Sequence, residues 1–209
     1  MASSAGHNIL KFRAPPAQPV DASARDDDGD WQLIERIGRG DAPAFEVFYK
    51  RYRRYLERFV YQVTRRQELV DDVINEVMLA VWQQAARTER LALASTWLLG
   101  IANFKSLQAM RKLGITRGSD GSMDEGSGDD SLAQRELEQD NLLNVALRHL
   151  SPEQRAAMEL VYFHGLHYQD IAKVMDCPEN TVKTRIFHAR KRLREVWPQL
   201  SGEQAGTSE

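Results

Sequence analysis

The sequence predicts an all-α protein with two small helical domains joined by a flexible linker, and three features of the chain support this prediction. Apolar residues recur at steps of three and four through residues 30–112 and again through residues 151–197, which is the period of a helix. No strand-like alternation competes with that period in the first segment. Between the two, residues 113–130 are rich in glycine, serine and acids, a composition typical of a flexible tether.

The two ends of the chain lack the periodicity of the helical segments. Residues 1–29 are rich in alanine, proline, serine and aspartate, and we expect them to form a disordered N-terminal tail. The polar residues 198–209 are expected to form a C-terminal tail, which leaves residues 30–112 and 131–197 as the two domains. There is no apolar run long enough for a membrane span and no signal peptide, so we expect a cytoplasmic protein. The single cysteine, Cys177, excludes an internal disulfide.

The first domain opens with two helix start signals. Asp30 and Asp41 are predicted N-caps, and a proline follows the second within one turn. A long helix should run from Asp41 to about Thr64. Its aromatic residues fall along one side and are expected in the core: Phe45, Phe48 and Tyr52.

The next predicted helix, residues 68–82, has two chemically different faces. An apolar stripe must point to the core, and the opposite face carries Asp72, Asn75, Glu76 and an exposed Leu79, with Asp71 nearby. Because these carboxylates would repel phosphates, the face suits a protein partner better than a nucleic acid. The alternative is a solvated acidic face with one stray leucine.

A polar link, residues 83–95, leads to another amphipathic helix, residues 97–112. That helix carries aromatic residues and ends in the basic pair Arg111-Lys112. A basic helix with aromatic residues can stack on unpaired bases and hold them. Elsewhere in the domain, Gly38-Arg39-Gly40 lacks the further glycine and the preceding strand of a nucleotide-binding loop, so it predicts no nucleotide site.

The second domain is predicted to form a helix-turn-helix. Ser151-Pro152-Glu153-Gln154 marks a helix start with a capping box, and Gly165 ends that helix. Residues 168–175 form a short helix, and Asp176-Cys177-Pro178 turns into the last helix. A helix-turn-helix places its second helix in the major groove of DNA.

The last predicted helix, within residues 178–197, has an apolar stripe and an opposite basic face. It contains six Lys or Arg against two Glu, although the whole chain has a formal net charge of −2. An exposed phenylalanine lies within this concentrated positive charge, which suits a duplex groove. The residues predicted to contact DNA are Lys183, Thr184, Arg185, Phe187, His188, Arg190 and Lys191. The alternative is a helical domain whose basic face is only solvated.

In this order, the motifs resemble the extracytoplasmic-function (ECF) group of the bacterial sigma-70 family of RNA polymerase sigma factors. The resemblance covers residues 31–197 and rests on four segments: Asp72-Val73-Ile74-Asn75-Glu76-Val77, Trp97-Leu98 with Ile101-Ala102, Leu150-Ser151-Pro152-Glu153-Gln154, and Thr181-Val182-Lys183-Thr184-Arg185. His188 stands where the family often has a basic residue, which leaves the preferred −35 sequence open.

The resemblance implies a transcription initiation factor with a region 2-like bundle and a region 4-like helix-turn-helix domain. Residues 69–82 would bind the beta-prime clamp helices of core RNA polymerase, with Asp72, Asn75 and Glu76 in contact. The second domain would contact the beta flap and read the −35 promoter element. Its base-edge residues would be Lys183, Thr184, Phe187 and His188, and its phosphate contacts would be Arg185 and Arg190.

Two further parts of the function follow from the same resemblance. The first domain would melt the −10 element and trap unstacked bases, and we expect the polar link, residues 83–95, to carry the −10 specificity. An anti-sigma factor would hold the free protein, and the flexible tether would permit a compact inhibited arrangement as well as an extended one.

Two other classes of protein remain open from the residues alone. A helix-turn-helix repressor or activator would bind duplex DNA without polymerase, but no dimerisation heptad or effector domain is evident and the acidic face would have no role. An enzyme is the second class. The spacing of His149, His164, His167 and Cys177 matches no common zinc site, and no catalytic grouping emerges. We therefore expect no metal, no cofactor and no catalytic activity.

Overall fold

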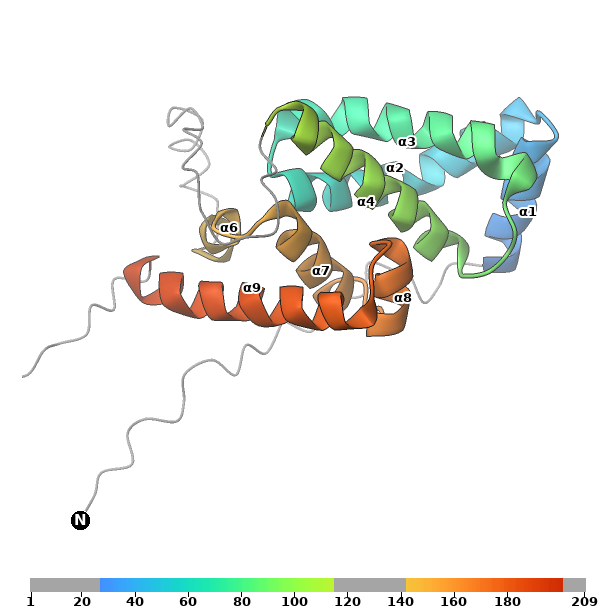
Figure 1. The fold of residues 1–209 in the computed structure, drawn as a ribbon. Coiled ribbons are helices and arrows are strands. Elements are labelled where there is room, and N and C mark those ends of the chain that lie inside the picture. Colours follow the sequence, from blue (N-terminus) through green and yellow to red (C-terminus); the bar gives the residue numbers. More distant parts are fainter. Residues whose placement is uncertain (1–26, 115–141, 201–209) are drawn as a thin grey trace, which may run out of the picture.

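The computed structural model describes residues 27–114 and 142–200, and all regular structure within them is helical. The elements are α1 (Asp27–Gly38), α2 (Ala42–Thr64), the 3-10 turn η1 (Gln67–Leu69), α3 (Val70–Gln84), the 3-10 turn η2 (Ala85–Arg87), α4 (Ala94–Lys112), α6 (Leu142–Arg148), α7 (Pro152–Tyr162), α8 (Tyr168–Val174) and α9 (Glu179–Leu200). Figure 1 shows two groups of helices, α1–α4 and α6–α9. The predicted all-α fold with two helical domains is confirmed. Nearly all of the predicted linker lies outside the described residues.

Helix α2 is the central helix of the first domain and packs against α1, α3 and α4. It begins where the sequence predicts, because the Asp41 carboxylate accepts a hydrogen bond from the Ala44 amide at 3.0 Å. Phe48 and Tyr52 are fully buried, as predicted. Phe45, also predicted to lie in the core, packs at its edge and is only half-buried. Its ring packs edge-on against Trp82, with centroids 5.4 Å apart.

The second domain has the predicted helix-turn-helix order α7, α8, α9. Ser151 and Gln154 form the capping box, with each side chain bonded to the other residue's backbone amide. After α7 ends, Gly165 adopts a left-handed conformation with φ of 64°, and the Leu166 amide bonds back to the Leu160 carbonyl. Helices α7 and α8 together cover the apolar side of α9.

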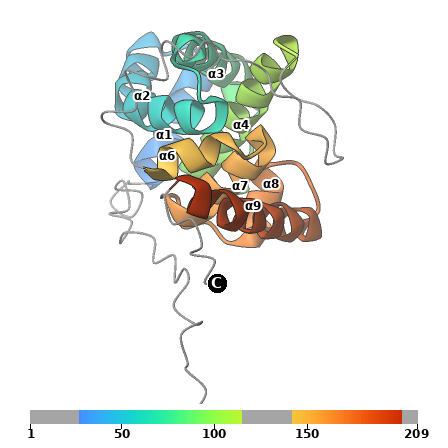
Figure 2. The same cartoon turned by 90° about the vertical axis from the view of Figure 1, so that its left-hand side faces the viewer.

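The two domains pack against each other in this structure. Helix α2 contacts α7, and α4 contacts α8, so the buried apolar residues of both domains form one continuous cluster. In Figure 2 the α1–α4 group lies directly above the α6–α9 group. Gly100 on α4 faces Val174 at the end of α8, where an added Cβ would lie 3.9 Å from the Val174 backbone. Helices α3 and α9 lie on opposite sides of the assembly (Figures 1 and 2).

The N-terminal boundary of the first domain differs from the prediction. Helix α1 begins at Asp27, within the segment predicted to be a disordered tail. Asp30 is not an N-cap, because it lies inside α1 and is 1% exposed. Its carboxylate accepts a hydrogen bond from the Tyr52 hydroxyl at 2.5 Å and pairs with Arg51. These partners are distant in sequence, so a local capping pattern could not reveal them.

Two other helix boundaries differ from the prediction by a few residues. Helix α4 begins at Ala94, three residues before the predicted start at Trp97. Helix α9 continues to Leu200, through Pro198, into the segment predicted to be a polar tail. A proline in a last turn removes only a hydrogen bond near the fraying end, so the helix tolerates it there. Among the described helices, none is long and apolar enough to cross a membrane.

Candidate functional surfaces

The outward face of α9 carries most of the residues predicted to contact DNA. Val182, Ile186 and Ala189 are buried against α7 and α8, so the helix presents only its other side to a partner. Phe187 is 64% exposed, and its ring meets His188 edge-on with centroids 5.4 Å apart. The exposed members of the predicted set are Lys183, Thr184, Phe187, His188, Arg190 and Lys191, whereas Arg185 is half-buried.

Several polar side chains on this face are held by neighbours. Lys183 pairs with Glu179 at 2.7 Å, one turn earlier on α9. Arg190 donates from Nε to the Tyr162 hydroxyl of α7 at 2.7 Å, and Arg185 contacts the Cys177 sulfur at 3.4 Å. A held guanidinium loses less freedom on binding, which suits a contact that sets the register of the protein on a phosphate backbone.

The outward face of α3 carries the residues predicted to contact a protein. Leu79 is 55% exposed, as predicted, while the apolar stripe on the opposite side is buried. Asp71, Asp72 and Asn75 are exposed near it, and Glu76 is half-buried. The helix therefore places one large apolar side chain among acidic and polar ones.

Two of these acids already have partners within the first domain. Glu76 accepts from Lys105 of α4 at 3.1 Å and lies 3.6 Å from Lys112. The hydrogen bond from Lys105 lowers the pKa of Glu76 below its ordinary value. Asp71 pairs with Arg53 of α2 at 3.1 Å. Asp72, Asn75 and Leu79 are therefore the members of the set most available to a partner.

Sequence reasoning missed one residue of this surface. Trp82 is 39% exposed and lies one turn beyond Leu79 on α3, where it packs against Phe45 of α2. The i, i+3 spacing from Leu79 is the signal that could have found it, because such residues are neighbours on a helix. The apolar part of the surface thus extends beyond a single leucine.

The connection between α3 and α4 is the region expected to read the −10 element. It is less polar at its surface than its sequence suggests, because Leu91 is 79% exposed and Leu93 is 54% exposed. On α4 itself, Phe104 is 56% exposed. The Phe104 ring can stack on an unpaired base, and exposed leucines can pack against the faces of bases.

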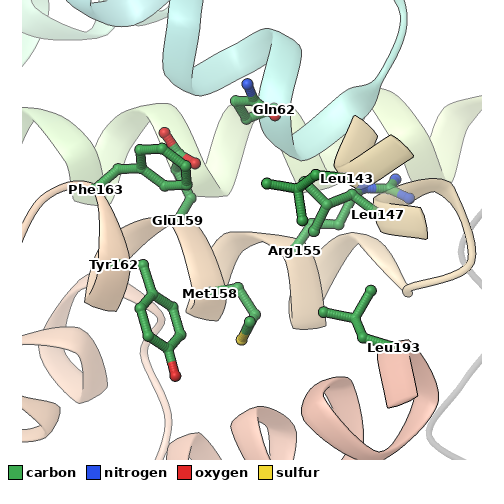
Figure 3. Close-up of a pocket in the computed structure, with 9 residues that line it drawn as sticks. All are labelled: Gln62, Leu143, Leu147, Arg155, Met158, Glu159, Tyr162, Phe163 and Leu193. Carbon is green, nitrogen blue, oxygen red and sulfur yellow. The ribbon is translucent and has the colours of Figure 1, made fainter. Parts of the chain in front are cut away.

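A small cavity of about 20 Å³ lies where the two domains meet (Figure 3). It is lined by Gln62 of α2, Leu143 and Leu147 of α6, Arg155, Met158, Glu159 and Tyr162 of α7, the following Phe163, and Leu193 of α9. This volume holds about one water molecule and no organic ligand. The cavity is therefore part of the domain interface and not a small-molecule site.

Two charged residues of α7 are buried in this interface. Arg155 donates from Nε to the Val63 carbonyl of α2 at 2.8 Å and from Nη1 to the Leu150 carbonyl at 2.7 Å. Burial, with the nearby charge of Arg65, lowers the pKa of Arg155 to about 10. Because Val63 is near the C-terminal end of α2, the guanidinium satisfies a carbonyl that its own helix leaves open.

Glu159 is the second buried charge. It lies 3.6 Å from Arg58 of α2 and 3.9 Å from His164, whose ring packs against Tyr55 and Phe59. Burial raises the pKa of Glu159 to about 7 and outweighs the opposing effect of Arg58 and Arg65. The carboxyl therefore titrates near neutral pH as long as the domains stay together.

The histidines and cysteine considered for zinc have other surroundings. His164 lies in the domain interface, and Cys177 lies in the turn between α8 and α9 beside Arg185. Within residues 27–114 and 142–200, no group of three or more His, Cys, Asp or Glu is placed to hold a metal ion.

Comparison with known protein families gives two matches in the order of the two domains. Sigma-70 region 2 matches residues 48–115, and Sigma-70 region 4 matches residues 140–193. The RNA polymerase sigma-H factor of Pseudomonas aeruginosa is 28% identical over 190 residues, covering 83% of this chain and 96% of the relative. The ECF RNA polymerase sigma-E factor of Escherichia coli K12 is 29% identical over 178 residues, covering 78% and 92%.

Solved structures with the same fold include two proteins that were each solved in a complex. CnrH, solved with the cytosolic domain of CnrY, superposes with a TM-score of 0.60 at 21% identity, covering 82% of this chain and 99% of CnrH. The sigma factor RpoE of Bartonella quintana, solved with the anti-sigma factor NepR, gives 0.55 at 23% identity, covering 73% and 96%. These two structures share the fold of this chain. The two family matches and the sequence relatives show that the chain belongs to the ECF group of the sigma-70 family of RNA polymerase sigma factors.

Proposed function

We propose that this protein binds core RNA polymerase through α3 and directs it to promoters by reading a −35 element with α9 and a −10 element with the first domain. The observation that carries the proposal is the separation of two surfaces of opposite charge. An acidic, partly apolar face and a basic face with an exposed aromatic ring lie on opposite sides of the molecule. One protein can therefore hold polymerase and DNA at the same time.

Residues of α9 divide by the contacts they can make. Lys183, Thr184, Phe187 and His188 lie near the start of the helix, the part that a helix-turn-helix inserts into the major groove. They are the proposed base-edge contacts. Arg185, Arg190 and Lys191 are the proposed phosphate contacts, and Arg190 is already held by Tyr162.

On α3 the proposed polymerase contacts are Asp71, Asp72, Asn75, Glu76 and Leu79. Leu79 supplies the apolar centre, and the acids around it exclude nucleic acid and complement a basic partner. The partner surface would be the clamp helices of the beta-prime subunit, while the second domain would contact the beta flap.

The −10 element would be opened and held by the connection before α4 and by α4. In the packed arrangement α8 covers part of α4, since these helices are in contact. The domains would therefore separate when both promoter elements are bound. CnrH and RpoE are each solved with a second protein, and we propose that an anti-sigma factor likewise holds this chain in the compact arrangement.

The proposed role requires binding and positioning alone, so no covalent bond is made or broken by this protein. Its partners, core polymerase and promoter DNA, place its site of action in the cytoplasm. A repressor with the same helix-turn-helix would instead bind a duplex operator without polymerase.

In vitro transcription with purified core polymerase tests the proposal. Start sites are mapped on genomic DNA with and without the full chain. Starts that depend on the protein, and that share two upstream elements at a fixed separation, would support a sigma factor. Tight binding to a palindromic duplex without polymerase, together with no dependent starts, would support the repressor instead.

A further inference from the structure

We infer that α1 positions the connection between α3 and α4, residues 85–93, so that its exposed side chains can read the −10 element. This inference rests on the proposed function. Beyond η2, residues 88–93 have no regular helix, yet they carry the exposed Leu91 and Leu93. A loop that is ordered before binding loses less freedom on binding, which strengthens recognition.

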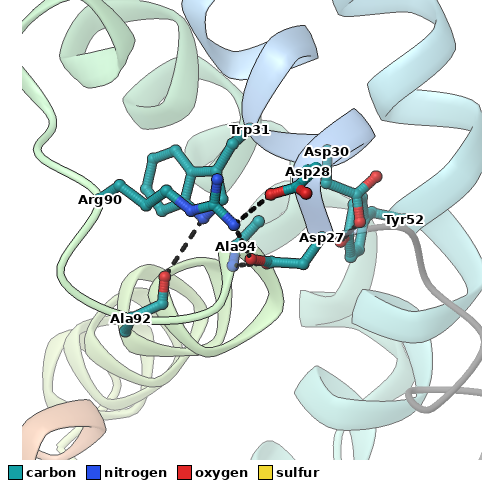
Figure 4. Close-up of polar contacts among 8 residues, drawn as sticks. All are labelled: Asp27, Asp28, Asp30, Trp31, Tyr52, Arg90, Ala92 and Ala94. Atoms are coloured by element: carbon teal, nitrogen blue, oxygen red, sulfur yellow. Dashed lines mark hydrogen bonds and ion pairs between the residues drawn. The ribbon is translucent and has the colours of Figure 1, made fainter.

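The first contact is made by the Asp27 carboxylate, which accepts hydrogen bonds from two groups of the connection and of α4 (Figure 4). Asp27 Oδ1 accepts from the Ala94 amide at 2.8 Å, and Oδ2 accepts from Arg90 Nη2 at 2.8 Å. The N-cap residue of α4 is Leu93, whose side chain cannot cap a helix. Asp27 therefore caps α4 from a different helix and fixes the end of the connection in the same step.

Two neighbours of Asp27 on α1 reinforce this attachment. Asp28 pairs with the same Arg90 nitrogen at 2.5 Å. The indole of Trp31, which is 4% exposed, donates to the Ala92 carbonyl at 3.2 Å, and its ring lies 6.0 Å from Trp97 of α4. Arg90, Ala92 and Ala94 are thus all bonded to the first turns of α1.

The other end of α1 meets the other end of the connection. Gly38 lies so close to η2 that an added Cβ would be 2.8 Å from the backbone nitrogen and Cα of Ala86. Only a residue without a side chain permits this approach. Helix α1 therefore contacts the connection at its start and at its end, and the two leucines lie near the end that Asp27 fixes.

The geometry also assigns different roles to neighbouring residues. Arg90 is engaged by two aspartates, and the hydrogen bond from Arg90 to Asp28 is the main cause of the raised pKa of Arg90. Arg90 is therefore a positioning residue and not a phosphate ligand. Leu91 and Leu93 are exposed, and they are placed to pack against the faces of unstacked bases.

The experiment uses the full chain and two measurements. Hydrogen exchange reports the order of residues 85–94. Binding of the holoenzyme is then measured on forked DNA that carries the unpaired −10 strand of a mapped promoter, with native or substituted −10 bases. The variants are Asp27→Ala, Asp27→Asn, Arg90→Ala and the double alanine variant. Arg39→Ala is the matched control, because Arg39 follows the far end of α1 and is 77% exposed.

Asp27→Ala should speed exchange in this segment and reduce discrimination between native and substituted −10 bases roughly three- to tenfold. Asp27→Asn retains an acceptor for Ala94 and should have a smaller effect. The double variant should lose less than the sum of the two single variants, because Asp27 and Arg90 share one contact while each also has a second partner. Core polymerase affinity, −35 discrimination and the Arg39→Ala variant should be unchanged.

Unchanged exchange or unchanged −10 discrimination in Asp27→Ala would overturn the inference. A loss of DNA binding in Arg90→Ala that Asp27→Ala does not share would show that Arg90 contacts DNA directly, and would also overturn it. If the wild-type chain directs no initiation with core polymerase, the proposed function itself fails and the −10 role fails with it. That result is seen before any substitution is made.

Discussion

The outward faces of α3 and α9 have the same plan with opposite charge. Each face has a large exposed apolar side chain among charged neighbours, Leu79 at 55% and Phe187 at 64%. The neighbours are acids on α3 and bases on α9. In the proposed function apolar contact would contribute affinity at both faces, and the sign of the surrounding charge would select protein at α3 and DNA at α9.

The two faces differ in how their charges are held. On α3, Glu76 and Asp71 pair with basic residues of the same domain, so their negative charge is partly neutralised within the protein. On α9, Lys183 likewise pairs with Glu179, but Arg190 is held by a neutral tyrosine and keeps its charge for a partner. A charged residue that is paired within the protein must give up that partner before its full charge can act on a binding partner.

The largest expected effect tests the α3 face. Asp72→Lys combined with Leu79→Ala removes the apolar centre and reverses an unpaired charge, so affinity for core polymerase should fall at least about a hundredfold. Glu76→Gln should lower it less than about tenfold, since Glu76 already pairs with Lys105. Fluorescence anisotropy of the labelled chain with core polymerase measures both.

The matched control is the substitution Glu35→Lys. Glu35 is an acid on a different helix, α1, and its side chain is 67% exposed. The control variant should bind core polymerase like the wild type, and all variants should keep a helical circular dichroism spectrum. Equal losses in the Glu35→Lys control would mean that overall charge, and not this face, governs the association.

The next effect tests the α9 face. Lys183→Ala or Phe187→Ala should weaken −35-dependent binding of the holoenzyme by about 1–3 kcal/mol and relax its sequence preference, while core affinity stays unchanged. Arg194→Ala removes the same charge from an exposed site farther along α9. It should therefore weaken binding of the holoenzyme to native and to scrambled −35 duplexes by the same factor. Identical behaviour of Lys183→Ala and Arg194→Ala would contradict a base contact at Lys183.

The sequence was sufficient wherever the interacting groups are close along the chain. Asp41 and Ser151 cap helices through amides three residues away, and the apolar stripe of α9 follows from helical periodicity. The candidate faces were predictable for the same reason, because the exposed side of a helix is the side opposite its apolar stripe.

Contacts between residues that are distant along the chain could not be predicted from local patterns. Asp27 pairs with Arg90, 63 positions away, and this pairing orders the start of α1 where composition predicts disorder. Asp30 binds Tyr52, 22 positions away, instead of capping a helix. Arg155 bonds to Val63, 92 positions away, across the domain interface. Such contacts depend on how helices pack, which local patterns do not encode.

The domain interface is the third test, since it determines whether the two faces act independently. Burial raises the pKa of Glu159 to about 7 in the packed arrangement, whereas a solvated carboxyl titrates near its ordinary value of 4.5. The protonated form therefore favours packing. Its stabilising contribution is complete below about pH 4.5 and is lost as the pH rises through about 7. The charged groups that also face this carboxyl are Arg58, Arg65 and His164.

We expect the packing equilibrium to weaken by roughly tenfold between pH 5.5 and pH 7.5, because ionising Glu159 leaves a buried charge. Small-angle scattering of the full chain should show a larger radius of gyration at the higher pH. Glu159→Gln cannot ionise, so its radius should change less over the same range. Glu195→Gln, an exposed acid of α9, should follow the wild type. A wild-type profile that matches that of Glu159→Gln would contradict the role of the carboxyl.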